Sequence, residues 1–156
     1  MDDIVKGLES FRGACRRMEY KGSVNGAAVY DDYGHHPTEI SATLSGARGM
    51  TDGRLVCVYQ PHTYSRTAAL FEEFTKAFEM CDRVIFADIY AAREVNTTGV
   101  STKQLAEHIG EKAVWGGDFD QCAKLLENSL KKGDVGIVMG AGDVYKVFEY
   151  LNFEDL

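Results

Sequence analysis

The sequence lacks any segment that would direct the chain to or through a membrane. Its 156 residues contain no apolar run of about 18 residues and no charged-then-apolar leader. They also lack a cluster of basic side chains, since the only adjacent basic pairs are Arg16-Arg17 and Lys131-Lys132 and the net charge is −7. A chain of this charge balance is poorly suited to bind nucleic acid or an anionic membrane. We therefore expect a soluble cytoplasmic protein with neither of these partners.

Cysteine is scarce and its spacing carries no metal-binding pattern. The four cysteines form no Cys-x-x-Cys pair, and Cys57 lies in an apolar stretch. Reduced structural thiols are therefore expected rather than disulfides. A zinc site could be imagined from His35, His36 and His62, but adjacent His side chains diverge and no fourth ligand is obvious. The sequence thus predicts no metal site.

Three common catalytic or nucleotide-binding motifs are missing as well. No Gly is followed by Lys, so the chain has no Walker A loop and is not expected to be a nucleoside triphosphatase on its own. The segment Gly140-Ala-Gly142 suggests a dinucleotide motif, but Tyr145 stands where a third Gly is needed. No Gly-x-Ser-x-Gly is present, which leaves Ser65 a poor nucleophile. A nicotinamide-binding domain and a serine hydrolase are both disfavoured.

What is present is a regular alternation of strands and helices in a single domain, residues 1–156, of which 45% are hydrophobic and 26% charged. Strands are expected at 17–21, 27–30, 54–59, 83–88, 113–115 and 134–139, and helices at 2–11, 38–44 with an end near 46–49, 68–80, 101–109, 118–130 and 144–151. Asn25-Gly26 predicts a hairpin between the first two strands, because this pair adopts positive φ with little strain. Crossover helices between the later strands predict parallel pairing. The fold class is thus α/β: a Rossmann-like three-layer sandwich, mostly parallel, with one antiparallel edge strand and helices on both faces.

The most informative stretch is residues 31–37, Asp-Asp-Tyr-Gly-His-His-Pro, which joins an apolar strand to a helix. In open α/β sheets, ligands bind beyond the carboxyl ends of the strands. Such residues can also simply cap a turn or a helix. Two carboxylates, a Tyr and two His exceed what a turn requires, so we favour a functional site. Three other polar segments also follow strands and are expected to converge on the same crevice: 60–67, 88–99 and 140–143.

The chain carries four ordered motifs: Asp31-Asp-Tyr-Gly-His-His-Pro-Thr-Glu39, Gln60-Pro-His-Thr-Tyr-Ser-Arg-Thr67, Asp88-Ile-Tyr-Ala-Ala-Arg-Glu94 and Met139-Gly-Ala-Gly-Asp143. Together they resemble the C-terminal domain of the Mur ligases, and within that family the members that join L-alanine to UDP-N-acetylmuramate in peptidoglycan biosynthesis. The resemblance covers nearly the whole chain. Members that attach a murein tripeptide in cell-wall recycling share a similar first motif but differ at the second, and they are the alternative. A stand-alone module that binds a nucleotide or an amino acid without chemistry is the other alternative.

The resemblance implies a three-domain, ATP-dependent ligase of the bacterial cytoplasm. In such enzymes an N-terminal domain binds the UDP-sugar and a central domain carries the P-loop and Mg²⁺. Both domains are expected to lie outside this chain and to be its partners within one polypeptide. The C-terminal domain closes over them and contributes to the nucleotide and amino-acid sites. ATP and Mg²⁺ would then be bound mainly by the central domain, and this chain alone is expected to be inactive.

Residue by residue, the resemblance implies that Arg17 reaches the nucleotide phosphates and that Asp32 contacts the ribose hydroxyls. Tyr33 and His35 would line the reaction centre, where they would act as catalytic and substrate-binding residues. For Arg17 the alternative is an ion pair with Glu19 at the edge of the hairpin.

His62 and Arg66 resemble the groups around the incoming alanine, and a guanidinium can donate two parallel hydrogen bonds to a carboxylate. The alternative for Arg66 is a surface position in the first turn of a helix, where a positive charge is slightly unfavourable. Thr63 departs from the family pattern, because many members have Arg there, and this leaves Arg66 as the cation of the motif. Arg93 and Glu94 are assigned no role, since a polar pair on a loop can simply bridge domains.

Overall fold

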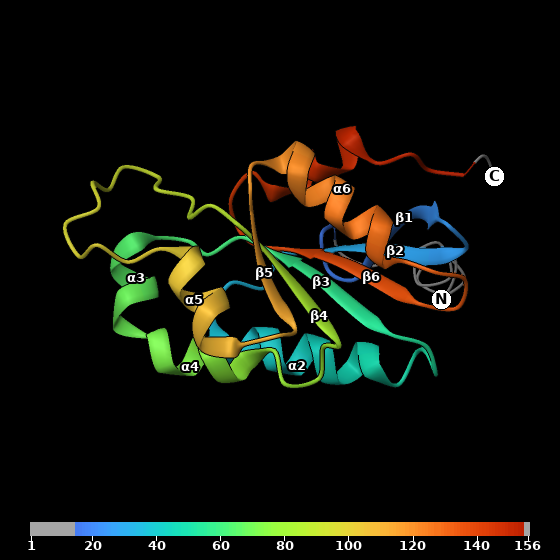
Figure 1. The fold of residues 1–156 in the computed structure, drawn as a ribbon, viewed down its shortest axis with the longest axis horizontal. Coiled ribbons are helices and arrows are strands. Elements are labelled where there is room, and N and C mark those ends of the chain that lie inside the picture. Colours follow the sequence, from blue (N-terminus) through green and yellow to red (C-terminus); the bar gives the residue numbers. More distant parts are fainter. Residues whose placement is uncertain (1–14, 155–156) are drawn as a thin grey trace, which may run out of the picture.

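The computed structural model describes residues 15–154 and contains one six-stranded sheet, in the order β1-β2-β6-β3-β4-β5 (Figure 1). β1 pairs antiparallel with β2, and every other neighbouring pair is parallel. The strands are β1 (Glu19–Val24), β2 (Ala27–Asp32), β3 (Leu55–Tyr59), β4 (Arg83–Ala87), β5 (Ala113–Gly117) and β6 (Val135–Met139). The helices are α2 (Pro37–Arg48), α3 (Tyr64–Ala69), α4 (Phe71–Ala77), α5 (Thr102–Ile109), α6 (Phe119–Ser129) and the 3₁₀ helix η1 (Val144–Tyr150). The expected mostly parallel α/β sheet with an antiparallel edge strand is confirmed.

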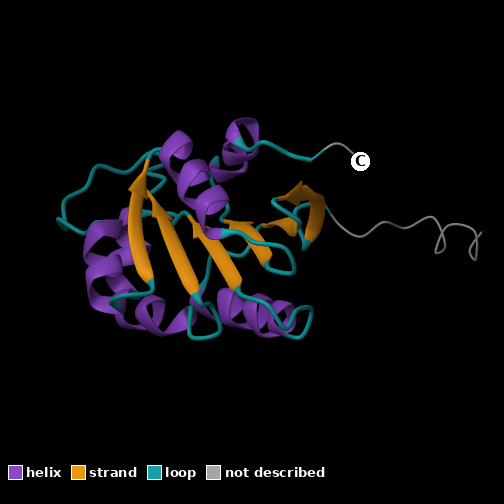
Figure 2. Ribbon diagram, turned by 45° about the vertical axis from the view of Figure 1, so that its right-hand side comes forward, coloured by secondary structure: helices purple, strands orange, loops and turns teal. Residues whose placement is uncertain are grey.

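Helices cover both faces of the sheet, and the central strands β3 and β6 are buried on both sides. All five residues of β3 are buried, and they alternate between two cores. Leu55, Cys57 and Tyr59 pack with residues of α2, α4 and α5, whereas Val56 and Val58 pack with α6 and η1. Figure 2 shows the resulting three layers, with the sheet between the two groups of helices.

The antiparallel edge arises from the predicted Asn-Gly turn. Asn25 and Gly26 have φ of 54° and 75°, and the two strands pair directly on either side of them. The first strand begins two residues later than expected and continues to Val24. The register shifts between Tyr20 and Gly22, as at a β-bulge, and the pairing resumes beyond it.

Two other sequence-based boundaries differ clearly from the structure. The helix expected at 68–80 begins earlier, at Tyr64, and is divided into α3 and α4 at Leu70, whose φ of −112° and ψ of 26° leave the helical region. The final helix, expected at 144–151, is present as a 3₁₀ helix at Val144–Tyr150. The strand near 113–115 continues to Gly117. The helix expected at 2–11 lies outside the described residues.

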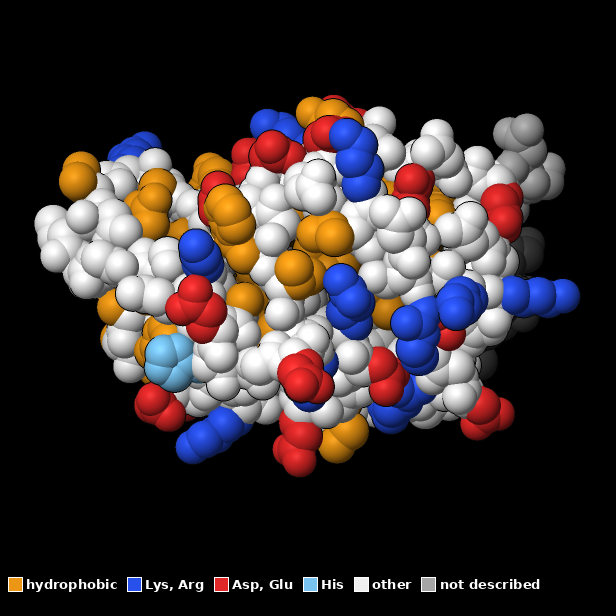
Figure 3. All heavy atoms as spheres, viewed as in Figure 1, with side chains coloured by type: hydrophobic (Ala, Val, Ile, Leu, Met, Phe, Trp, Pro, Cys, Tyr) orange, Lys and Arg blue, Asp and Glu red, His pale blue; other side chains and the backbone are white. Residues whose placement is uncertain are grey.

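The surface bears both signs of charge. On the face shown in Figure 3, Lys and Arg side chains are interspersed with Asp and Glu. Among residues 15–154, no helix combines the length and the apolar character needed to cross a bilayer. All four cysteines are free, and Cys57, Cys81 and Cys122 are buried.

Candidate functional site

Four polar segments meet beyond the carboxyl ends of the strands, as the sequence predicted. The strand ends are in register, since Met139 of β6 pairs with Asp32 of β2 and with Tyr59 of β3. Gln60 then crosslinks the segments: its Nε2 donates to the backbone oxygen of Asp88 at 3.3 Å and to Oδ1 of Asp143 at 3.1 Å. The topology thus brings residues distant in sequence to one edge of the sheet.

A row of four rings runs across this edge, and we call it the Tyr–His row: Tyr33, His35, His62 and Tyr90. Successive ring centroids lie 5.7, 6.4 and 5.3 Å apart. The last pair, His62 and Tyr90, is stacked with an interplanar angle of 19°. The structure therefore gathers three of the predicted site residues, and it adds Tyr90, which sequence reasoning had not singled out.

His35 is held in place by its own segment and by the core. Its Nδ1 lies 3.3 Å from the Tyr33 backbone oxygen and 3.5 Å from Oε2 of Glu39. Glu39 also accepts the backbone N–H groups of His35 and His36, which hold the pKa of its carboxyl below the usual value. The hydroxyl of Tyr59, a fully buried residue, donates to the His35 backbone oxygen at 3.2 Å. The ring is therefore oriented before any ligand binds.

His62 is disposed to be a neutral imidazole. Burial, followed by the positive charge of Arg66, lowers the pKa of His62 below its ordinary value. Its Nδ1 is buried and has no hydrogen-bond partner among the described residues. Nη1 of Arg66, in the first turn of α3, donates to the His62 backbone oxygen at 2.8 Å, so the two predicted alanine-site residues are in direct contact. The arrangement offers a guanidinium beside a neutral base.

Arg16 and Arg17 have different environments. Nε of Arg16 pairs with Asp31 at 3.1 Å, and its Nη2 donates to the Gly140 backbone oxygen at 2.6 Å. Burial raises the pKa of Asp31 despite this ion pair. Arg17 is exposed, with its guanidinium carbon 6.0 Å from the centre of the Tyr33 ring. Arg16 thus joins β2 to the loop after β6, a role the sequence did not indicate, whereas Arg17 faces solvent.

The carboxylate of Asp32 accepts hydrogen bonds from other parts of the chain. The residue is 2% exposed, and Oδ2 accepts the Met18 N–H at 3.0 Å. Oδ1 accepts the Gly34 N–H at 2.9 Å and lies 3.4 Å from the Thr43 hydroxyl. A ribose contact by Asp32 stays a prediction, and it would require some of these donors to move.

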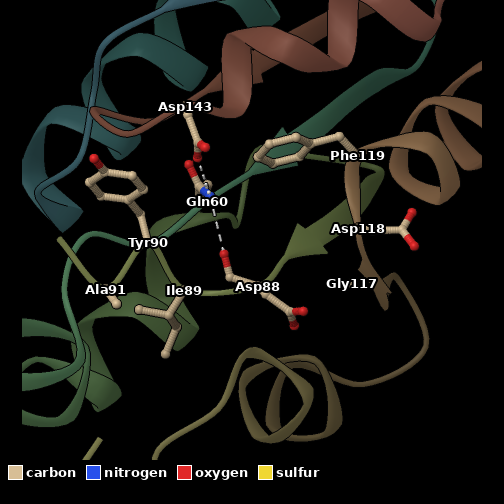
Figure 4. A pocket seen from close by; sticks show the side chains of 9 residues that line it. All are labelled: Gln60, Asp88, Ile89, Tyr90, Ala91, Gly117, Asp118, Phe119 and Asp143. Atoms are coloured by element: carbon tan, nitrogen blue, oxygen red, sulfur yellow. Dashed lines mark hydrogen bonds between the residues drawn. The ribbon is translucent and has the colours of Figure 1, made fainter. Parts of the chain in front are cut away.

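A pocket of about 310 Å³ is lined in part by Tyr90, the last residue of the Tyr–His row (Figure 4). Its polar lining includes Gln60 and the carboxylates of Asp88, Asp118 and Asp143. The Asp88 carboxylate accepts the indole N–H of Trp115 at 2.8 Å. Within residues 15–154, no group of three His, Cys, Asp or Glu side chains is arranged to hold a metal ion.

The fold and the site define a class of protein. The family model described as Mur ligase, glutamate ligase domain, matches residues 16–142, so this chain belongs to the Mur ligase family as its C-terminal domain. The UDP-N-acetylmuramate–L-alanine ligase of Clostridium kluyveri is 49% identical over an alignment of 156 positions, which covers 97% of this chain and 34% of that protein. The chain therefore spans about a third of the length of the curated relatives it matches.

Solved structures agree on the fold. The crystal structure of the UDP-N-acetylmuramate–alanine ligase of Thermotoga maritima superposes with a TM-score of 0.72 at 25% identity, over 94% of this chain and 31% of that one. A murein peptide ligase of Psychrobacter arcticus reaches a TM-score of 0.67 at 24% identity, over 97% of this chain and 33% of that one. The second likeness speaks for the fold alone.

Proposed function

We propose that this chain is the C-terminal domain of a ligase that uses ATP to join L-alanine to UDP-N-acetylmuramate in peptidoglycan biosynthesis. The observation that carries the proposal is the 49% identity to relatives named for that reaction, over nearly the whole chain. The Tyr–His row and Arg66 supply chemistry that suits it. The N-terminal and central domains of the same polypeptide would be its partners, and the cytoplasm its location.

In this proposal the muramoyl carboxylate becomes an acyl phosphate, and the alanine amine attacks its carbonyl carbon. The new C–N bond forms as the C–O bond to phosphate breaks, and phosphate leaves. ATP and Mg²⁺, when bound, supply the activation, and the exposed Arg17 is suited to the nucleotide phosphates. Closure of this domain would exclude water from a hydrolysable intermediate.

The residues of the crevice would prepare the amino acid. The Arg66 guanidinium can hold the alanine carboxylate in a bidentate pair. A neutral His62 can accept a proton from the alanine ammonium, which must lose one before its nitrogen can attack. Tyr33 and His35, at the other end of the Tyr–His row, would line the reaction centre.

The proposal is tested by expressing the full-length protein and supplying ATP, Mg²⁺ and UDP-N-acetylmuramate with either L-alanine or the murein tripeptide. Phosphate release that depends on L-alanine is expected. Release that depends only on the tripeptide would favour the recycling ligase, and the absence of both would favour a binding module.

The 156-residue chain alone is expected to neither hydrolyse ATP nor ligate alanine, because it has no phosphate-cradling loop. Only part of the nucleotide site would lie here, so ATP should bind no tighter than about millimolar. Calorimetry and a phosphate-release assay against a blank without protein would check this. Micromolar binding would instead identify a self-sufficient nucleotide module.

A further inference from the structure

Glu94 lies on the long loop between β4 and α5, and its side chain forms hydrogen bonds with the start of α3. Its Oε1 accepts the hydroxyls of Thr63 and Ser65, each at 2.6 Å. Its Oε2 accepts the backbone N–H of Ser65 at 2.8 Å. One carboxylate therefore receives three hydrogen bonds from a segment 29 to 31 residues away.

These contacts replace the usual cap of the helix. Thr63 occupies the N-cap position of α3 but makes no side-chain cap bond of its own, because its hydroxyl points to Glu94. Glu94 instead accepts an N–H of the first turn, where a negative charge is favoured. The helix that carries Arg66 is thus capped by a distant loop.

The same loop also contacts Pro61 and His62, the residues just before Thr63, through Tyr90. Its ring stacks on His62, and its backbone N–H donates to the Pro61 oxygen at 2.9 Å. Tyr90 and Glu94 therefore contact residues 61–65 at two points. His62 is itself in contact with Tyr90, and Arg66 directly follows the residues that Glu94 contacts.

We propose that Glu94 is a positioning residue for the amino-acid site, which it fixes by clamping the start of α3 to the loop between β4 and α5. This rests on the proposed function, and it gives Glu94 no contact with substrate. Arg66 donates to the His62 backbone oxygen rather than to Glu94 in the described structure, so the clamp does not neutralise the guanidinium that would bind the alanine carboxylate.

The clamp has a defined pH dependence. Hydrogen bonds from the Ser65 and Thr63 hydroxyls and from the Ser65 N–H lower the pKa of Glu94 from 4.5 to about 2. A carboxyl with a lowered folded-state pKa contributes stability that is complete above 4.5 and is lost as the pH falls through about 2. Carbon-detected NMR titration should place the Glu94 midpoint well below 4.5. A Glu94 midpoint at or above 4.5 would show that the clamp does not form in solution.

The first test of the proposal uses the chain itself. Glu94→Ala should speed hydrogen exchange of the Ser65 amide by about tenfold or more, since a charge-assisted hydrogen bond is lost. Glu107→Gln is the matched control and should leave that rate unchanged. Ser65→Ala removes one hydroxyl from the other side of the clamp, and its effect should not add to that of Glu94→Ala. Unchanged exchange in Glu94→Ala would overturn the clamp, whatever reaction the protein catalyses.

The second test uses the full-length enzyme. Glu94→Ala should raise the Michaelis constant for L-alanine about five- to tenfold while the constants for ATP and UDP-N-acetylmuramate change less than twofold. Glu94→Gln, which keeps one acceptor oxygen, should recover part of the loss. Faster Ser65 exchange with an unchanged alanine constant would overturn the positioning role. If the wild-type enzyme does not ligate alanine at all, the proposed function fails, whereas the exchange experiment still decides the clamp.

Discussion

Replacement of Arg66 by alanine in the full-length enzyme is expected to raise the apparent Michaelis constant for L-alanine about ten- to a hundredfold. A charge-assisted pair between the guanidinium and the substrate carboxylate is worth roughly 1.5–3 kcal/mol, which corresponds to this range. Arg66 is half-buried and anchored by its hydrogen bond to the His62 backbone oxygen, so little side-chain entropy is lost when the carboxylate binds. Steady-state kinetics with each substrate varied in turn would measure the effect.

Arg93→Ala is the control for the loss of a positive charge, because Arg93 is exposed on the neighbouring loop. It should change the alanine constant less than about twofold. An unchanged constant in Arg66→Ala would assign Arg66 to the helix surface. Thr63→Arg is not expected to rescue that variant, because the Thr63 hydroxyl faces Glu94, and an arginine there would pair with that carboxylate.

The strands and their burial on both faces could be predicted, because the apolar runs that indicate them are local features of the sequence. Continuous apolar runs such as residues 54–59 can be buried on both faces only in a parallel sheet covered by helices. The division of the helix at Leu70 could not be predicted. The apolar spacing of 68–80 continues smoothly across that position, and the first turn of α3 is hydrogen-bonded to Glu94, which is distant in sequence.

The candidate site was predictable where its residues lie on strand ends. Tyr33, His35 and His62 were expected to converge, and their rings do lie side by side. The contacts of Arg16 with Asp31 and Gly140 were not predicted. Two adjacent arginines in a sequence do not indicate which of the side chains points toward the protein interior. Here Arg16 turns toward Asp31, and Arg17 is left exposed. Contacts of this kind depend on tertiary packing and carry no periodic or spacing signal.

The role of Thr63 shows the same limit. Many family members have Arg at this place in the second motif, but the sequence left open which way the Thr63 side chain faces. The structure directs its hydroxyl to the loop between β4 and α5. The motif shows that residue 63 differs from the family pattern, but the direction of its side chain is set by its neighbours in space.

Asp32→Ala is expected to destabilise this chain by about 3 kcal/mol, even with no nucleotide present. The substitution would leave the N–H groups of Met18 and Gly34 without their acceptor, and each unsatisfied buried donor costs roughly 1–3 kcal/mol. It would also release the Thr43 hydroxyl of α2. Three segments that frame the crevice would thus lose a common anchor. Urea unfolding followed by the fluorescence of the single Trp would measure the change.

Two further variants make the result decisive. Asp52→Ala removes an exposed carboxylate from a turn and should change the free energy of unfolding by less than about 0.5 kcal/mol. Asp32→Asn keeps one acceptor oxygen and should fall between the two, because its amide group would face a donor that the carboxylate now accepts. If Asp32 served only to bind ribose, Asp32→Ala would be as stable as the wild-type chain without nucleotide. A loss near 3 kcal/mol would instead mean that Asp32 stabilises the fold around the crevice. A kinetic defect of this variant would then be explained first by the disturbed crevice and not by a lost ribose contact.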